Sequence, residues 1–151
     1  MLHSKNASGW NTYTLGKIPL NNMKTAYIDV DDKWGIVIIY DFDTEYECDE
    51  LEAIMKSFGM NTRNTNKALR ILSTKNSGMA VSREDIKMSA LFIGNTTSIP
   101  EWWSTVAHEL HHAATAIIDY YNEPYYGEGD AYLHGYLLQQ VVEQMAIPLC
   151  K

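Results

Sequence analysis

The sequence lacks the features that mark small secreted domains and membrane proteins. It has only two cysteines in 151 residues, Cys48 and Cys150, which are too few for a disulfide framework. We therefore expect reduced thiols and a cytoplasmic location, with a single Cys48–Cys150 bridge as the alternative. No apolar run approaches the roughly eighteen residues that cross a bilayer, so no membrane partner is expected. The first ten residues also lack the apolar centre of a signal peptide.

Positive charge is scarce as well. Lys and Arg number 12 against 19 Asp and Glu, which gives a net charge of −7. No basic stripe offsets this balance, so nucleic acid is not expected as a partner. The chain has no internal repeat, low-complexity tract or linker. Its length suits one domain with a sizeable core, and residues 1–151 are predicted to form that domain.

Hydrophobic patterning predicts an α+β fold. Strands are predicted for the β-branched and apolar runs 25–30, 34–40, 78–82 and 86–93, with a less regular one at Tyr13–Ile18. Helices are predicted for 45–58, 64–74, 99–121 and 127–147. Thr44 and Ser98 are the expected N-caps of the first and third helices. Strands followed by helices, twice over, imply a small mixed or antiparallel sheet packed against helices.

The most specific pattern in the chain is His108-Glu109-Leu110-His111-His112, an HExxH motif inside a helical segment. His108 and His112 lie four residues apart on one helix face. Two such imidazoles can share one zinc ion, with ring nitrogens about 2.0–2.1 Å from the metal. Glu109 lies about 100° around the helix. There its carboxylate can take the proton of a catalytic water rather than bind the metal.

The HExxH pattern also occurs by chance in ordinary helices. The faces of this helix help to decide between a metal site and such a chance match. Three of the chain's five histidines fall within the motif. A narrow stripe without Lys or Arg contains Glu101, Thr105, His108, His112, Thr115 and Asp119. Its short side chains beside the histidines suit the floor of a cleft that admits a cation, although a solvated face would give a similar stripe. Thr115 and Asp119 are candidate hydrogen-bond partners of the ligand imidazoles, whereas His111 is predicted to be a surface or packing residue.

A catalytic zinc ion takes three protein ligands and keeps one open position. Downstream candidates for the third ligand are Glu123, Glu128, Asp130 and His134. Glu128 opens the last predicted helix, with Ala131, Tyr132 and Gly135 on its side. The two small residues, Ala131 and Gly135, would let this side approach the HExxH helix, so Glu128 is preferred. An acidic residue favoured by the helix dipole is the alternative interpretation.

The second half of the chain, about residues 78–151, carries a resemblance. HExxH followed by a glutamate on a later helix resembles the gluzincin branch of the zincin-like metallopeptidases. Residues 91–137 are similar to small HExxH proteins of phage and mobile-element origin. Those proteins show a strand ending in Phe-Ile-Gly, a Thr-x-x-His-Glu-x-x-His helix and then Glu-x-x-Ala-Tyr-x-x-Gly. The resemblance implies a zincin-like fold and a metallopeptidase-like site in which Glu128 is the downstream glutamate, but it implies no substrate.

Together these patterns predict zinc-dependent hydrolysis of a peptide or protein substrate. His108, His112 and Glu128 are the predicted zinc ligands, Glu109 is the predicted general base, and Tyr132 is the candidate for stabilising the oxyanion, with His134 behind it. The strand at 86–93 is expected to offer an edge for an extended peptide. One alternative replaces Glu128 by His134 as the third ligand. The other is a non-enzymatic phage or host-interaction scaffold with a structural or vestigial metal. The oligomeric state is not indicated.

Overall fold

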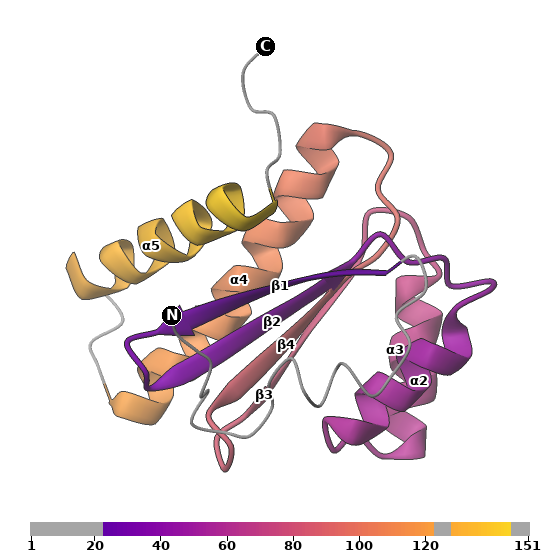
Figure 1. Cartoon of the computed structure of the whole chain (residues 1–151), viewed down its shortest axis with the longest axis horizontal. Coiled ribbons are helices and arrows are strands. Elements are labelled where there is room, and N and C mark those ends of the chain that lie inside the picture. The colour runs from indigo at the N-terminus through magenta and orange to yellow at the C-terminus, as the bar shows by residue number, and fades with distance from the viewer. Residues whose placement is uncertain (1–22, 123–127, 146–151) are drawn as a thin grey trace.

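A computed structural model describes residues 23–122 and 128–145. In this part of the chain, a four-stranded sheet lies between two pairs of helices (Figure 1). The strands are β1 (Lys24–Val30), β2 (Trp34–Tyr40), β3 (Gly78–Arg83) and β4 (Met88–Ile93). The helices are α2 (Cys48–Ser57), α3 (Thr62–Leu72), α4 (Ile99–Tyr121) and α5 (Glu128–Met145). The predicted α+β class is confirmed, while the strand predicted at Tyr13–Ile18 lies outside the described residues.

The sheet is mixed, with the strand order β1-β2-β4-β3. β1 and β2 form an antiparallel hairpin, β2 and β4 run parallel, and β3 returns antiparallel to β4. The prediction that the strand at 86–93 offers a sheet edge is wrong, because β4 lies between β2 and β3. All six residues of β4 are buried, as suits a strand covered on both faces. The edge strands are instead β1 and β3, and β3, the neighbour of β4, is only half-buried.

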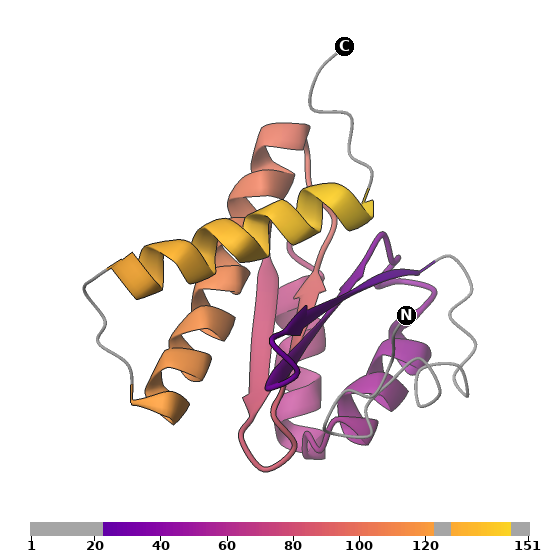
Figure 2. The ribbon, with the colours of Figure 1, turned by 60° about the vertical axis from the view of Figure 1, so that its left-hand side comes forward.

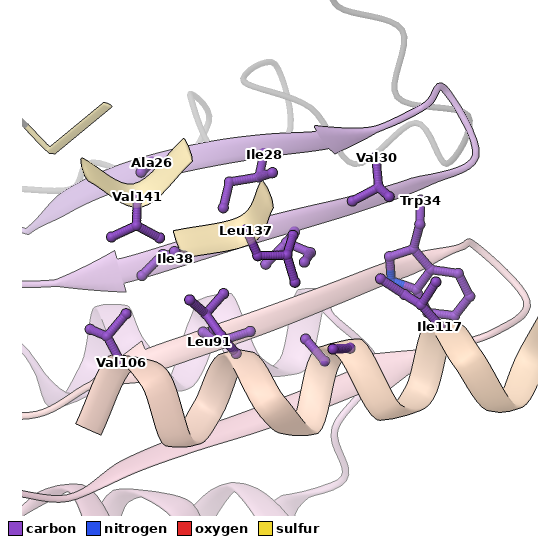
Figure 3. Close-up of a cluster of buried hydrophobic side chains, with 14 of the residues drawn as sticks. Ala26, Ile28, Val30, Trp34, Ile38, Leu91, Val106, Ile117, Leu137 and Val141 are labelled. Carbon is purple, nitrogen blue, oxygen red and sulfur yellow. The ribbon is translucent and has the colours of Figure 1, made fainter. Parts of the chain in front are cut away.

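Two hydrophobic cores lie on opposite faces of the sheet, because successive side chains of a strand alternate between faces. Val37 and Ile39 of β2 pack toward α2 and α3, whereas Ile36 and Ile38 pack toward α4 and α5. Figure 3 shows the second core, where side chains of the sheet meet those of both covering helices. Its labelled members from the helices are Val106, Ile117, Leu137 and Val141. Both helices are therefore held against the sheet by buried apolar side chains.

The ends of α4 agree with their local sequence signals. Ser98 is the N-cap, and its hydroxyl accepts a hydrogen bond from the amide of Glu101 at 3.3 Å. Pro100 occupies the first turn, where a missing N–H costs nothing. Asn122 ends the helix in the left-handed conformation with φ 55°. The N-cap predicted at Ser98 and the end predicted at Tyr121 are thus both confirmed.

The start of α2 differs from the prediction. Thr44 is not its N-cap, because the helix begins at Cys48. A separate turn comes first, in which the Asp43 carboxylate accepts from the amide of Glu45 at 2.9 Å. The Glu47 carboxylate accepts from the amide of Asp43 at 2.6 Å, closing that turn. These local hydrogen bonds compete with helix formation and delay its start by three residues.

The face that α5 turns to the protein also differs from the prediction. Leu137 and Val141 are fully buried, whereas Ala131 is exposed and nothing lies within 4 Å of a Cβ built on Gly135. The expected close approach through these two small residues is therefore wrong. Burial of leucine and valine removes more apolar area from water than burial of alanine and glycine. The larger gain in free energy determines which face of α5 packs against the protein. Figure 2 shows α5 (yellow) crossing α4 (orange) on this face.

Two further features concern the same part of the chain. Cys48 is a free thiol, and Cys150 lies outside the described residues. Among residues 23–122 and 128–145, no helix combines the length and the apolar character that a bilayer span requires.

The orientation of α5 predicts how two substitutions differ in their effect on stability. Leu137→Ala removes a fully buried side chain and is expected to lower the free energy of unfolding by about 2–5 kcal/mol. Tyr132→Ala changes a side chain that is 74% exposed and is expected to shift it by at most about 0.5 kcal/mol. Urea unfolding followed by circular dichroism measures both. A larger loss for Tyr132→Ala than for Leu137→Ala would contradict this orientation.

Candidate metal centre

His108 and His112 lie on α4 with their ring nitrogens together. Their Nε2 atoms are 3.2 Å apart, and their ring centroids are 4.8 Å apart. Two nitrogens bound to one zinc ion at tetrahedral angles are about 3.3 Å apart, given Zn–N distances of about 2.0–2.1 Å. Both side chains are exposed, so an ion can reach them. The two residues therefore fit two adjacent ligand positions of a zinc ion.

The lowered pKa of His112 also suits metal binding. Partial burial lowers the pKa of His112, and the neighbouring imidazoles of His108 and His111 lower it further. A neutral imidazole offers a lone pair to a metal, whereas an imidazolium does not. At a separation of 3.2 Å one Nε2–H can donate to the other Nε2. For both Nε2 atoms to bind one ion, that proton must move to Nδ1 of its own ring.

Glu109 is directed away from the solvent that bathes the two histidines. This residue is only 5% exposed, whereas His108, which precedes it, faces solvent. Burial raises the pKa of the Glu109 carboxyl above its usual range, and charge on His108 offsets part of that rise. No described donor forms a hydrogen bond with this carboxylate. A buried carboxylate without such a partner is costly, and groups of this kind are concentrated at functional sites.

The first residue of β3 makes room for Glu109. A Cβ added to Gly78 would lie 2.8 Å from Cγ of Glu109 and 2.9 Å from Cγ2 of Thr105. Real Cβ atoms do not come so close to their neighbours. Glycine therefore lets the edge strand lie directly against the carboxylate-bearing face of α4.

Two adjoining hollows lie between α4 and β3, and together we call them the α4–β3 groove. One measures about 350 Å³ and extends past Ser104 to Glu101. The other measures about 450 Å³ and extends past Met79 to Ala116. The two hollows share three lining residues, which are Gly78, His108 and Glu109. His108 and the buried carboxylate of Glu109 thus lie where the two hollows meet beside the sheet edge, and His112 lines the second hollow.

The third ligand is not found among the described residues. No group of three His, Cys, Asp or Glu side chains there is placed to hold an ion. Glu128 begins α5, but its side chain lies outside the described residues. The residues predicted to share its side of the helix, Ala131, Tyr132 and Gly135, are exposed. The packing argument for Glu128 is therefore lost, and its assignment now depends on the resemblance alone.

His134, the alternative third ligand, has other partners. Its Nε2 lies 3.1 Å from Oδ1 of Asp130 on the same helix. Its ring centroid lies 5.2 Å from that of His111. His111 is therefore a packing residue between α4 and α5, in agreement with its predicted role. The structure places His134 beside His111, and no described group of three ligands joins it to His108 and His112.

The sequence matches no protein-family model, no curated protein and no solved structure. The chemistry of this site is therefore inferred from its own residues and their geometry.

The remaining predicted site residues receive no support from the described contacts. Tyr132 is 74% exposed and lines neither hollow. No hydrogen bond of Thr115 or Asp119 to the histidines is found among the described residues. Conversely, sequence analysis missed Gly78, whose role depends on which strand forms the sheet edge. A glycine opening a predicted strand was the only local sign of a close approach.

The contact of β3 with α4 predicts opposite effects for two glycine substitutions. In Gly78→Ala the new methyl group must displace Glu109 or Thr105, so stability is expected to fall by about 1–3 kcal/mol. Gly135→Ala is the matched control, because it adds the same methyl group to α5 in open space. A stability gain of about 0.5–1 kcal/mol is expected there. Chemical unfolding of both variants checks this, and a Gly78→Ala variant as stable as the parent would contradict the close contact.

Proposed function

We propose that the chain is a zinc-dependent peptide hydrolase with a zincin-like site on α4. The observation that carries this proposal is the position of Glu109. Its buried carboxylate lacks a described hydrogen-bond partner and lies in the groove beside two imidazoles. The Nε2 atoms of those imidazoles are separated by 3.2 Å, as adjacent zinc ligands would be. This combination provides a metal-binding pair and an available base at one point.

His108 and His112 would hold the zinc ion, and Glu128 remains the predicted third ligand. A bound zinc ion polarises a substrate carbonyl and lowers the pKa of water toward neutrality. Catalytic zinc sites keep one position open for water, whereas structural sites are closed by four protein ligands.

Glu109 is the proposed general base. Its carboxylate accepts a proton from the water that attacks the scissile carbonyl carbon, and the water oxygen bonds to that carbon. The C–N bond then breaks, and Glu109 delivers the proton to the leaving amine. The burial that raises the pKa of Glu109 makes this carboxylate a stronger base toward water than an exposed one.

The groove suits an extended peptide as substrate. β3 forms one wall and is an edge strand of the sheet. Edge strands offer backbone N–H and C=O groups with which an added strand can pair. A peptide bound in this way passes directly over Gly78, next to Glu109 and the histidine pair. Tyr132 remains only a prediction as the group that stabilises the oxyanion.

The scaffold alternative also stays open to experiment. A chain that binds zinc and hydrolyses no peptide would favour a structural or vestigial metal. The resemblance to phage-related proteins and the cytoplasmic location are likewise predictions from the sequence.

We expect the purified protein to contain about one zinc ion per chain. His108→Ala and His112→Ala should each abolish this occupancy, because each removes one of two adjacent ligands. His111→Ala is the matched control: it lies in the same motif but contacts His134, and it should retain zinc. Elemental analysis after dialysis measures the occupancy. Full zinc content in both ligand variants would reject the site.

The same measurement locates the third ligand. Glu128→Ala is expected to weaken zinc affinity, whereas Asp130→Ala and His134→Ala are expected to leave it unchanged. Loss of zinc in His134→Ala, together with its retention in Glu128→Ala, would replace the gluzincin-like assignment by the histidine alternative.

We further expect Glu109→Gln to bind zinc like the parent and to lose peptide hydrolysis. Glutamine has nearly the same shape but accepts no proton at neutral pH. Removal of a general base lowers the turnover number by about 10²–10⁴-fold. Peptide cleavage followed by mass spectrometry, with zinc content measured on the same samples, tests this. Unchanged turnover in the variant would exclude Glu109 as the base.

A further inference from the structure

The hollow that extends from His108 to Glu101 is lined by a second carboxylate without a described partner, besides that of the proposed base Glu109. Glu101 lies in the first turn of α4, and its side chain is exposed to this hollow of about 350 Å³. No described residue forms an ion pair with it. No Lys or Arg lines either half of the α4–β3 groove. The negative charge of Glu101 is therefore available to a ligand.

Several other polar groups around this hollow are already engaged within the protein. The Asn76 carboxamide accepts from the amide of Thr97 at 2.8 Å and donates to the Thr97 hydroxyl at 3.0 Å. The Ser77 hydroxyl donates to the carbonyl of Ile71 at 2.8 Å. The Thr105 hydroxyl donates to the carbonyl of Glu101 at 2.9 Å. These residues form the wall of the hollow, which leaves Glu101 as its acidic residue besides Glu109.

The two halves of the groove differ in character. The half toward Ala116 is lined by Met79 and Ala80 and contains no acidic residue besides Glu109. The half toward Glu101 places a carboxylate seven residues from His108 on the same helix. That spacing is two turns, about 10.5 Å along the axis at 1.5 Å per residue. A side chain that extends from a backbone held at His108 toward Glu101 must therefore be long.

We propose that the Glu101 half of the groove binds a basic side chain, Lys or Arg, of the peptide substrate. The Glu101 carboxylate pairs with its ammonium or guanidinium group, and the chain thereby selects peptides with a basic residue at one position near the cleaved bond. This inference rests on the proposed hydrolase function. Glu101 acts here as a specificity residue and takes no part in bond cleavage.

The competing explanation is that Glu101 stabilises the N-terminus of α4, because carboxylates in a first turn interact favourably with the helix dipole. That role affects the stability of α4 and leaves substrate preference unchanged. Specificity and stability measured on the same variants therefore separate the two explanations.

The test uses the purified full chain loaded with zinc and a library of peptides with randomised positions. Cleavage sites are identified by mass spectrometry. Values of kcat/KM are then compared for matched peptides that carry Lys, Met or Glu at the preferred position. We expect kcat/KM for the Lys peptide to exceed that for the Met peptide by about fivefold, as for an ion pair at a solvent-accessible site. In Glu101→Gln this preference should disappear, and in Glu101→Lys the Glu peptide should become the preferred one.

Glu45→Gln is the matched control, because it removes one exposed carboxylate at the start of the α2 region, outside the groove. It should keep the parent's preference for Lys. All variants should keep the zinc content of the parent, since Glu101 is not a proposed ligand.

The outcomes distinguish this inference from the proposed function. Cleavage by the parent without preference for a basic residue, or an unchanged preference in Glu101→Gln, overturns the inference and leaves the hydrolase intact. A zinc-loaded chain that cleaves no peptide in the library overturns the proposed function and the inference with it. A lower melting temperature of Glu101→Gln with unchanged specificity assigns Glu101 to the helix start instead.

Discussion

The packing of α4 on the sheet is the constraint on which the rest of the structure depends. One stripe of the helix is buried against β4 and the neighbouring strands, and its apolar members are Val106, Leu110, Ala113, Ala114 and Ile117. Because this stripe fixes the rotation of α4 about its own axis, it also fixes the direction of every other side chain on the helix. His108 and His112 are thereby exposed together at one border of the buried face. Ligands on a rigid, docked helix are better organised than ligands on a loop.

The same docking brings the edge strand against α4 and links the fold to the proposed chemistry. Gly78 has no side chain, so β3 can lie within van der Waals distance of Glu109 and cover its carboxylate. A carboxylate covered by protein holds a proton more readily than one in water, which is the direction of the pKa change at Glu109. The hollows on either side of this contact leave the groove open in both directions. A backbone contact at one glycine thus contributes both to the shape of the groove and to the raised pKa of the Glu109 carboxyl.

The helix that follows shows where reasoning from local pattern failed. The small residues Ala131 and Gly135 suggested a close approach of α5 to α4, yet this side of the helix is exposed. Leu137 and Val141 occupy the contact instead, and the Tyr136 hydroxyl donates to the carbonyl of Asp29 at 2.7 Å. Small residues permit close packing, but burial of large apolar side chains supplies the free energy that orients a helix. The third ligand was inferred from that orientation, so its packing argument failed with it.

The sequence by itself determined the features that depend on neighbours within a few residues. It was sufficient for the extent of α4 from Ser98 to Asn122 and for the pairing of His108 with His112, since capping and the helical repeat are local. The tertiary structure alone decided that β3 rather than β4 forms the sheet edge, that Gly78 covers Glu109, and which face of α5 is buried. Strand order and helix rotation result from the total apolar area buried between segments far apart in the chain. This total buried area cannot be obtained from a short stretch of sequence.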